Sequence, residues 1–158
     1  MPQQISHDLF SKTFFTLLQE TFEKVEGIYL DKGTSLLETV AAITAAEASR
    51  PIAPNGTTIA GHVDHIRFYL RVLNDYMDGN WHQNLDWKQS WLTAKVTESE
   101  WDALRKDLEA DYQHLLTHLK SFTDWNDNHR LGGAMGIIVH TAYHLGAIRQ
   151  IIHAARRK

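Results

Sequence analysis

Two histidines, His140 and His144, are four residues apart in the segment IIVHTAYHLGAIRQII. On an α-helix this spacing places both imidazoles on one face, and Ile137 and Ile148 mark that face as buried. Burying two imidazoles without partners costs free energy. Neutral imidazole is the commonest protein ligand for transition metals and suits zinc, nickel and iron. The segment therefore predicts part of a metal site that needs a third ligand from elsewhere in the chain.

The third ligand can come from the segment TIAGHVDHIRFYL, in which His62 and His65 are three residues apart. Apolar residues flank both positions, so helical periodicity does not choose between them. A single histidine on an apolar helix is more often a hydrogen-bonded core or rim residue than a ligand, and this alternative stays open for both. The residues predict a site of about three imidazoles.

A second pair with the same spacing, His114 and His118, serves as a comparison. Its face extends back to Asp107 and Asp111, which favours a solvated position. The last predicted helix contains no Asp or Glu, and this excludes a carboxylate-bridged di-iron site. Thr141 stands where the zinc-protease pattern His-Glu-x-x-His has its general base, which excludes that class too. No catalytic residue can be assigned from the sequence.

Composition narrows the classes of function further. The chain has 158 residues, which is long enough for one domain spanning residues 1–158. Its formal charge of −3 gives no sign of the basic surface that nucleic-acid binding requires. The absence of cysteine excludes disulfides and thiolate ligands. The N-terminal residues lack a signal-peptide pattern, and polar residues interrupt the apolar stretch 131–152. We therefore expect a cytoplasmic protein without a membrane span.

Apolar residues recur with the helical period, and strand patterns are hard to find. Thr57 or Thr58 can cap one helix, and Thr97 with Glu100 forms a capping-box pattern before another. Four principal helices and one lesser segment predict an all-α fold, a four-helix bundle. The expected helices cover residues 6–25, 35–49 (short and interrupted), 58–77, 98–122 and from 131 or 133 to the C-terminus, with one short helix within 80–96.

The stretches TTIAGHVDHI and HTAYHLGAIRQ resemble the DinB-like metalloproteins, small helical bundles related to bacillithiol and mycothiol transferases. The resemblance spans roughly residues 6–155 in helix order, but only the two histidine segments are specific. In that family the first ligand follows a Ser/Thr-Ile start by about seven positions, which from Thr58 favours His65 over His62. The metal ligands that the resemblance implies are His65, His140 and His144.

The resemblance also implies an up-up-down-down bundle, a divalent metal (zinc, nickel or iron) and a homodimer. The implied activity is a metal-dependent thiol (S-)transferase or a hydrolase acting on small molecules. Because the chain has no cysteine, the thiol would have to be a small molecule. A non-catalytic metal- or ligand-binding bundle, and a helical interaction protein with ordinary core histidines, stay open. The last helix is apolar all round, which predicts that the dimer forms partly through it.

Overall fold

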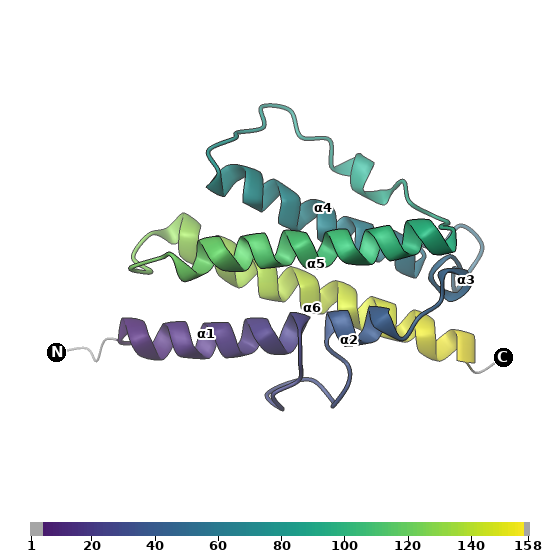
Figure 1. Ribbon diagram of the computed structural model, residues 1–158, viewed down its shortest axis with the longest axis horizontal. Coiled ribbons are helices and arrows are strands. Elements are labelled where there is room, and N and C mark those ends of the chain that lie inside the picture. Colours follow the sequence, from purple (N-terminus) through teal and green to yellow (C-terminus); the bar gives the residue numbers. More distant parts are fainter. Residues whose placement is uncertain (1–4, 157–158) are drawn as a thin grey trace.

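The protein is described by a computed structural model covering residues 5–156, and within this range it contains helices but no strand. Four long helices pack side by side (Figure 1), as the all-α prediction requires. These helices are α1 (His7–Phe22), α4 (Ile59–Met77), α5 (Glu98–Lys120) and α6 (Asn128–Arg156). Three short helices lie in the connections: α2 (Leu36–Ala41), α3 (Ala45–Ala48) and the 3₁₀ helix η1 (Trp87–Trp91).

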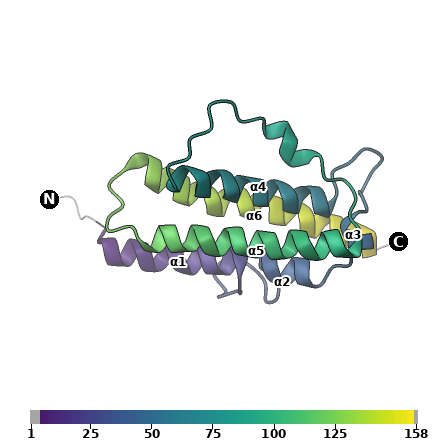
Figure 2. The ribbon, with the colours of Figure 1, turned by 45° about the horizontal axis from the view of Figure 1, so that its top comes forward.

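Helices α4 and α5 run parallel. Arg67 of α4 pairs with Asp107 of α5 at 3.3 Å, and further along both helices Asp78 contacts His118 at 3.0 Å. The connection after α4, residues 79–97, therefore has to return along the bundle before α5 can start. Figures 1 and 2 show this connection arching away from the packed helices, with η1 inside it.

Helices α1 and α6 are antiparallel to α4 and α5. In the first half of α6, the Gly136 backbone approaches the hydroxyl of Tyr69 in α4. Further along α6, His144 contacts His62, which precedes Tyr69 in α4, so the two helices are antiparallel. In α1, the late residue Phe22 stacks on Tyr112 of α5, while the N-terminal half of α1 packs near the residues that follow α5. The helix order is thus up-down-down-up (Figure 2), not the predicted up-up-down-down, because the long crossover follows α4.

The starts of α4 and α5 follow the predicted capping residues. The Thr58 side chain accepts from the N–H of Gly61, and Thr97 and Glu100 form both bonds of a capping box. Helix α6 begins at Asn128, earlier than predicted, because the Asp127 side chain accepts from the N–H of Arg130 at 2.7 Å. Helix α1 ends at Phe22 instead of near residue 25, and the interrupted segment 35–49 resolves into α2 and α3.

The inward faces of the long helices form the apolar core. Trp101 of α5 donates its indole N–H to the Ile43 carbonyl at 2.8 Å and so ties α5 to the turn between α2 and α3. By length and hydropathy alone, α6 could cross a membrane. The core helix of a globular bundle can have the same length and hydropathy. The buried residues that flank the histidines on α4 and α6 are Ile59, Val63, Ile66, Ile137, Thr141 and Leu145.

Candidate metal centre

Four histidines converge where α4 faces α6. One nitrogen each from His65, His140 and His144 lie within 4.8 Å of one another. His65 Nε2 and His140 Nε2 are 3.0 Å apart. His62 joins at the edge, with its Nδ1 atom 3.1 Å from His144 Nδ1. The structure thus brings together the three predicted ligands, with His62 in contact with one of them.

Simple helix geometry explains this convergence. The i,i+4 pair His140 and His144 and the i,i+3 pair His62 and His65 each project from one face of their helix. Because α4 and α6 are antiparallel, the earlier histidine of one pair meets the later histidine of the other. Two helical turns, separated by more than 70 residues in sequence, therefore present four imidazoles to the same volume.

A side chain from the crossover determines the tautomer of His65. The Ser90 hydroxyl donates its single hydrogen to the Trp87 carbonyl oxygen at 2.7 Å. It can therefore only accept from His65 Nδ1, which lies 2.7 Å from Ser90 Oγ. His65 consequently carries its proton on Nδ1, and the lone pair on Nε2 faces His140. Metal-binding histidines commonly donate their second ring N–H to a protein acceptor in this manner.

Aromatic rings hold the planes of two of these imidazoles. Trp91 of η1 stacks on His65 with 4.0 Å between ring centroids, and Tyr69 of α4 stacks on His140 with 4.2 Å. Tyr69 has room because residue 136 is glycine: a Cβ there would lie 3.2 Å from the tyrosine hydroxyl. The imidazoles are therefore constrained by packing as well as by hydrogen bonds.

The electrostatics of the cluster keep the imidazoles neutral. Burial, with a smaller contribution from neighbouring histidines, lowers the pKa of His65 to about 4 and that of His144 to about 3. Burial also lowers the pKa of His62 and of His140. At neutral pH the ring nitrogens therefore offer lone pairs with little competition from protons. His140 Nδ1 is buried without a hydrogen-bond partner among the described residues.

The donor set fits a divalent transition metal. Three neutral nitrogen donors suit zinc, nickel or iron, and they leave positions for water or substrate in the manner of a catalytic site. The carboxylate nearest in sequence, Asp64, takes no part in the cluster. It accepts from the Thr93 hydroxyl at 2.6 Å and pairs with Arg67 at 3.5 Å.

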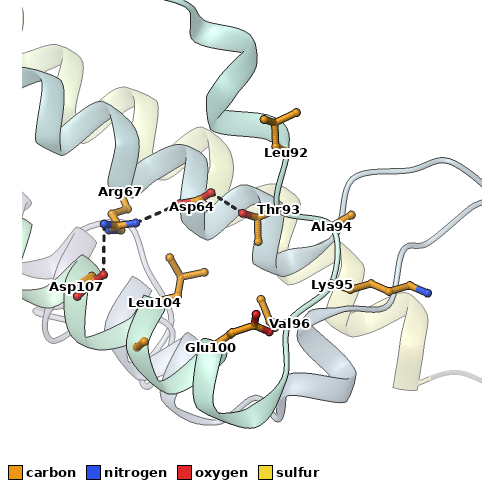
Figure 3. Close-up of a pocket in the computed structure, with 11 residues that line it drawn as sticks. Asp64, Arg67, Leu92, Thr93, Ala94, Lys95, Val96, Glu100, Leu104 and Asp107 are labelled. Carbon is orange, nitrogen blue, oxygen red and sulfur yellow. Dashed lines mark hydrogen bonds and ion pairs between the residues drawn. The ribbon is translucent and has the colours of Figure 1, made fainter.

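Asp64 instead faces a cavity of about 680 Å³ between α4, α5 and residues 92–96 (Figure 3). Its lining mixes acids and bases, including Glu100, Asp107 and Lys95, and contains none of the four converging histidines. The cavity and the histidine cluster are therefore separate features on two faces of α4.

Two residues of the site were not foreseen from the sequence. Ser90 and Trp91 lie in residues 80–96, which were predicted only as a connection with a short helix, and that helix is η1. Their sequence signal is weak, because a serine between two tryptophans is as compatible with solvent as with burial.

His114 and His118 lie far from the cluster, near the end of α4, and His114 is exposed as predicted. Arg149 of α6 pairs at 3.3 Å with Asp31, which lies in the connection between α1 and α2.

Comparison with known protein families places most of this chain in one of them. Residues 31–148 match the model of the DinB superfamily, a stretch that includes the four histidines and η1. The match covers well over half of the chain. No curated protein and no solved structure gave a significant match.

Proposed function

Because this chain belongs to the DinB superfamily, we propose that it is a divalent-metal-dependent enzyme acting on small molecules, with His65, His140 and His144 as the metal ligands. The observation that carries the proposal is the convergence of three neutral imidazole nitrogens, one of which has its lone pair directed inward by Ser90.

The reaction class we propose is thiol (S-)transfer to an electrophile or hydrolysis. An ion with three neutral ligands keeps its full charge, so it can lower the pKa of a bound water to about 7 or stabilise a bound thiolate. The chain contains no cysteine, so a thiol substrate would be a small molecule. Within the protein, Ser90 and Trp91 hold His65, and Tyr69 holds His140, so that the ligands are pre-positioned.

Metal analysis tests the proposed ligands first. Protein purified without a histidine tag, incubated with zinc and then dialysed, should retain zinc in the cluster. His140→Ala and His65→Ala should each lose this zinc, because each removes one of the three proposed ligands and His62 lies only at the edge of the cluster. His82→Ala is the matched control, since His82 hydrogen-bonds to Asp75 and lies outside the cluster. Zinc retention by both cluster variants at the wild-type level would overturn the assignment.

Activity assays separate the enzyme from a non-catalytic binder. Zinc- and nickel-loaded protein should consume small thiols with electrophilic acceptors, or hydrolyse simple esters or amides, and His140→Ala should not. A metal-loaded protein without turnover on either panel would be a metal- or ligand-binding bundle. Absence of metal together with absence of turnover would favour the interaction protein.

A further inference from the structure

We propose that the chain carries a second site for a divalent transition-metal ion, formed by Asp78, His114 and His118. One atom of each residue lies within 4.8 Å of the other two. His118 Nε2 is 3.0 Å from Asp78 Oδ1 and 3.1 Å from His114 Nε2, and His114 Nε2 is 3.6 Å from Asp78 Oδ2. The residues come from the end of α4 and the second half of α5, away from the four converging histidines.

These spacings suit ligands around one ion. With zinc–nitrogen and zinc–oxygen distances near 2.1 Å, neighbouring ligand atoms in a tetrahedral site are about 3.4 Å apart. His118 Nε2 lies 3.0 Å from Asp78 Oδ1 and 3.1 Å from His114 Nε2, near this value, and His114 Nε2 lies 3.6 Å from the other carboxylate oxygen. The two Nε2 atoms face different oxygens of Asp78 and lie 3.1 Å from each other, so only one proton fits between the two rings. A cation accepts all three lone pairs at once.

Backbone hydrogen bonds at the end of α4 fix the position from which the Asp78 side chain projects. Asp78 is the C-cap of α4, and Gly79 follows it with a φ of +85°, the left-handed conformation that ends many helices. The Gly79 N–H bonds the Tyr76 carbonyl at 3.2 Å and the Asn80 N–H bonds the Asp75 carbonyl at 2.7 Å. This pair of bonds is a Schellman motif, which orders the end of the helix and, with it, the carboxylate.

The parallel course of α4 and α5 favours a cation here. Both helices end at this side of the molecule, and a helix C-terminus carries a partial negative charge. Asp78 adds a full negative charge at the end of α4, where a carboxylate is unfavourable by itself. A divalent ion between the two helix ends would offset both contributions.

The donor set distinguishes this site from the first. It has two nitrogens and one carboxylate oxygen, whereas the histidine cluster offers only nitrogens. It is also open to solvent, since the His114 side chain is 50% exposed. We therefore expect weaker and more rapidly exchanging binding than in the buried cluster, with the ion clamping the end of α4 to α5.

Zinc binding to tag-free protein tests the second site, measured by isothermal titration and by elemental analysis after equilibrium dialysis. Wild type should bind about two zinc ions per chain, and His118→Ala and Asp78→Asn about one. His82→Ala is the control, because His82 and Asp75 form an exposed pair at 2.7 Å without a third ligand, and it should match wild type. Circular dichroism should confirm that each variant is folded, as expected for partly exposed positions.

The outcomes separate the two sites. His140→Ala should lose the tighter ion and keep the weaker one, whereas His118→Ala should do the reverse. If His118→Ala and Asp78→Asn bind as much zinc as wild type, the second site is wrong. If these variants lose an ion while His140→Ala loses none, the second site stands and the proposed function fails. A single ion that His140→Ala abolishes completely would also overturn the second site.

Discussion

Ser90 shows how one hydroxyl outside the proposed ligand set can govern it. Its side chain is 1% exposed, and its oxygen lies between the Trp87 carbonyl and His65 Nδ1. Without this acceptor, His65 could place its proton on Nε2, the nitrogen that faces His140. The hydroxyl therefore keeps one lone pair directed at the cluster in every neutral molecule.

Ser90→Ala should accordingly weaken zinc binding in the cluster by about 10- to 100-fold, the usual cost of removing a partner of a metal-binding histidine. The fold should be kept, because alanine fills most of the same space. Competition with a chromophoric zinc chelator measures the affinity. Thr13→Ala, which removes an exposed hydroxyl that bonds the Leu9 carbonyl in α1, serves as a control outside both proposed metal sites. Equal affinities of Ser90→Ala and wild type would show that Ser90 has no such role.

At the same scale, sequence reasoning identified the residues with distinctive spacing and missed those without it. The i,i+4 pair on an apolar helix pointed to His140 and His144, and the structure places both beside His65. The position of His62 was left open, and it contacts His144 at 3.1 Å. Ser90 could not be found, because its contact with His65 depends on how the crossover folds back, which no local pattern encodes.

At the scale of elements, a buried carboxylate anchors the connection after α1. Glu20 is fully buried and accepts hydrogen bonds from three consecutive N–H groups, those of Ile28, Tyr29 and Leu30, at 2.7–2.8 Å. Burial alone would raise the pKa of the Glu20 carboxyl, but these hydrogen bonds outweigh it and hold the pKa below the ordinary 4.5. The ionised group is thus part of the folded structure.

Glu20→Gln should lower the free energy of unfolding by about 2 kcal/mol at neutral pH, since hydrogen bonds to a charged acceptor are lost. A carboxyl with a lowered folded-state pKa stabilises above its unfolded pKa and loses that effect as the pH falls. The difference between wild type and variant should therefore shrink as the pH drops below 4.5. Urea unfolding at several pH values measures it, with Glu26→Gln, at an exposed neighbouring position, as control. A difference independent of pH would contradict the assigned role of the charge.

The helices themselves could be predicted well where local chemistry sets their ends. Thr58 and the Thr97–Glu100 capping box start α4 and α5 as expected. The start of α6 was placed too late because the Gly132–Gly133 pair looked like a helix boundary, whereas Asp127 caps the helix earlier. The Asp31 partner of Arg149 was not predictable, because it lies in a connection with no periodic pattern.

At the scale of the whole molecule, an apolar stripe on α6 faces outward. Val139 and Tyr143 are 64% and 73% exposed, and Met135 continues the same face one turn earlier. Exposed apolar patches of this kind commonly mark protein–protein contacts. The stripe borders the histidine cluster, since Tyr143 lies against His144 with 5.0 Å between ring centroids. We propose that this face joins two copies of the chain in a homodimer, in keeping with the apolar character of the whole helix.

Val139→Asp should shift the protein from dimer to monomer, because a dimer would bury the new charge without a partner. Sedimentation equilibrium or light scattering after gel filtration reports the mass. Gln113→Asp, a new charge at an exposed position of α5, should leave the mass unchanged. A wild-type protein that is monomeric at the highest concentrations reached would rule out this interface.

The helix order was the part of the fold that periodicity could not determine. A connection as long as residues 79–97 is compatible with either direction for the next helix, and only tertiary contacts such as Arg67 with Asp107 settle it. The molecule therefore has two parts: the scaffold, formed by α1, α4, α5 and α6, and the insert, residues 79–97. Two of the four packed helices, α4 and α6, supply the imidazoles, whereas the insert, which arches away from the bundle (Figure 1), supplies Ser90 and Trp91. Changing residues 81–85, which lie between the capped end of α4 and Asp86, the cap of η1, would therefore alter how the insert presents Ser90 and Trp91 to His65 while the buried core of the four helices stays as it is.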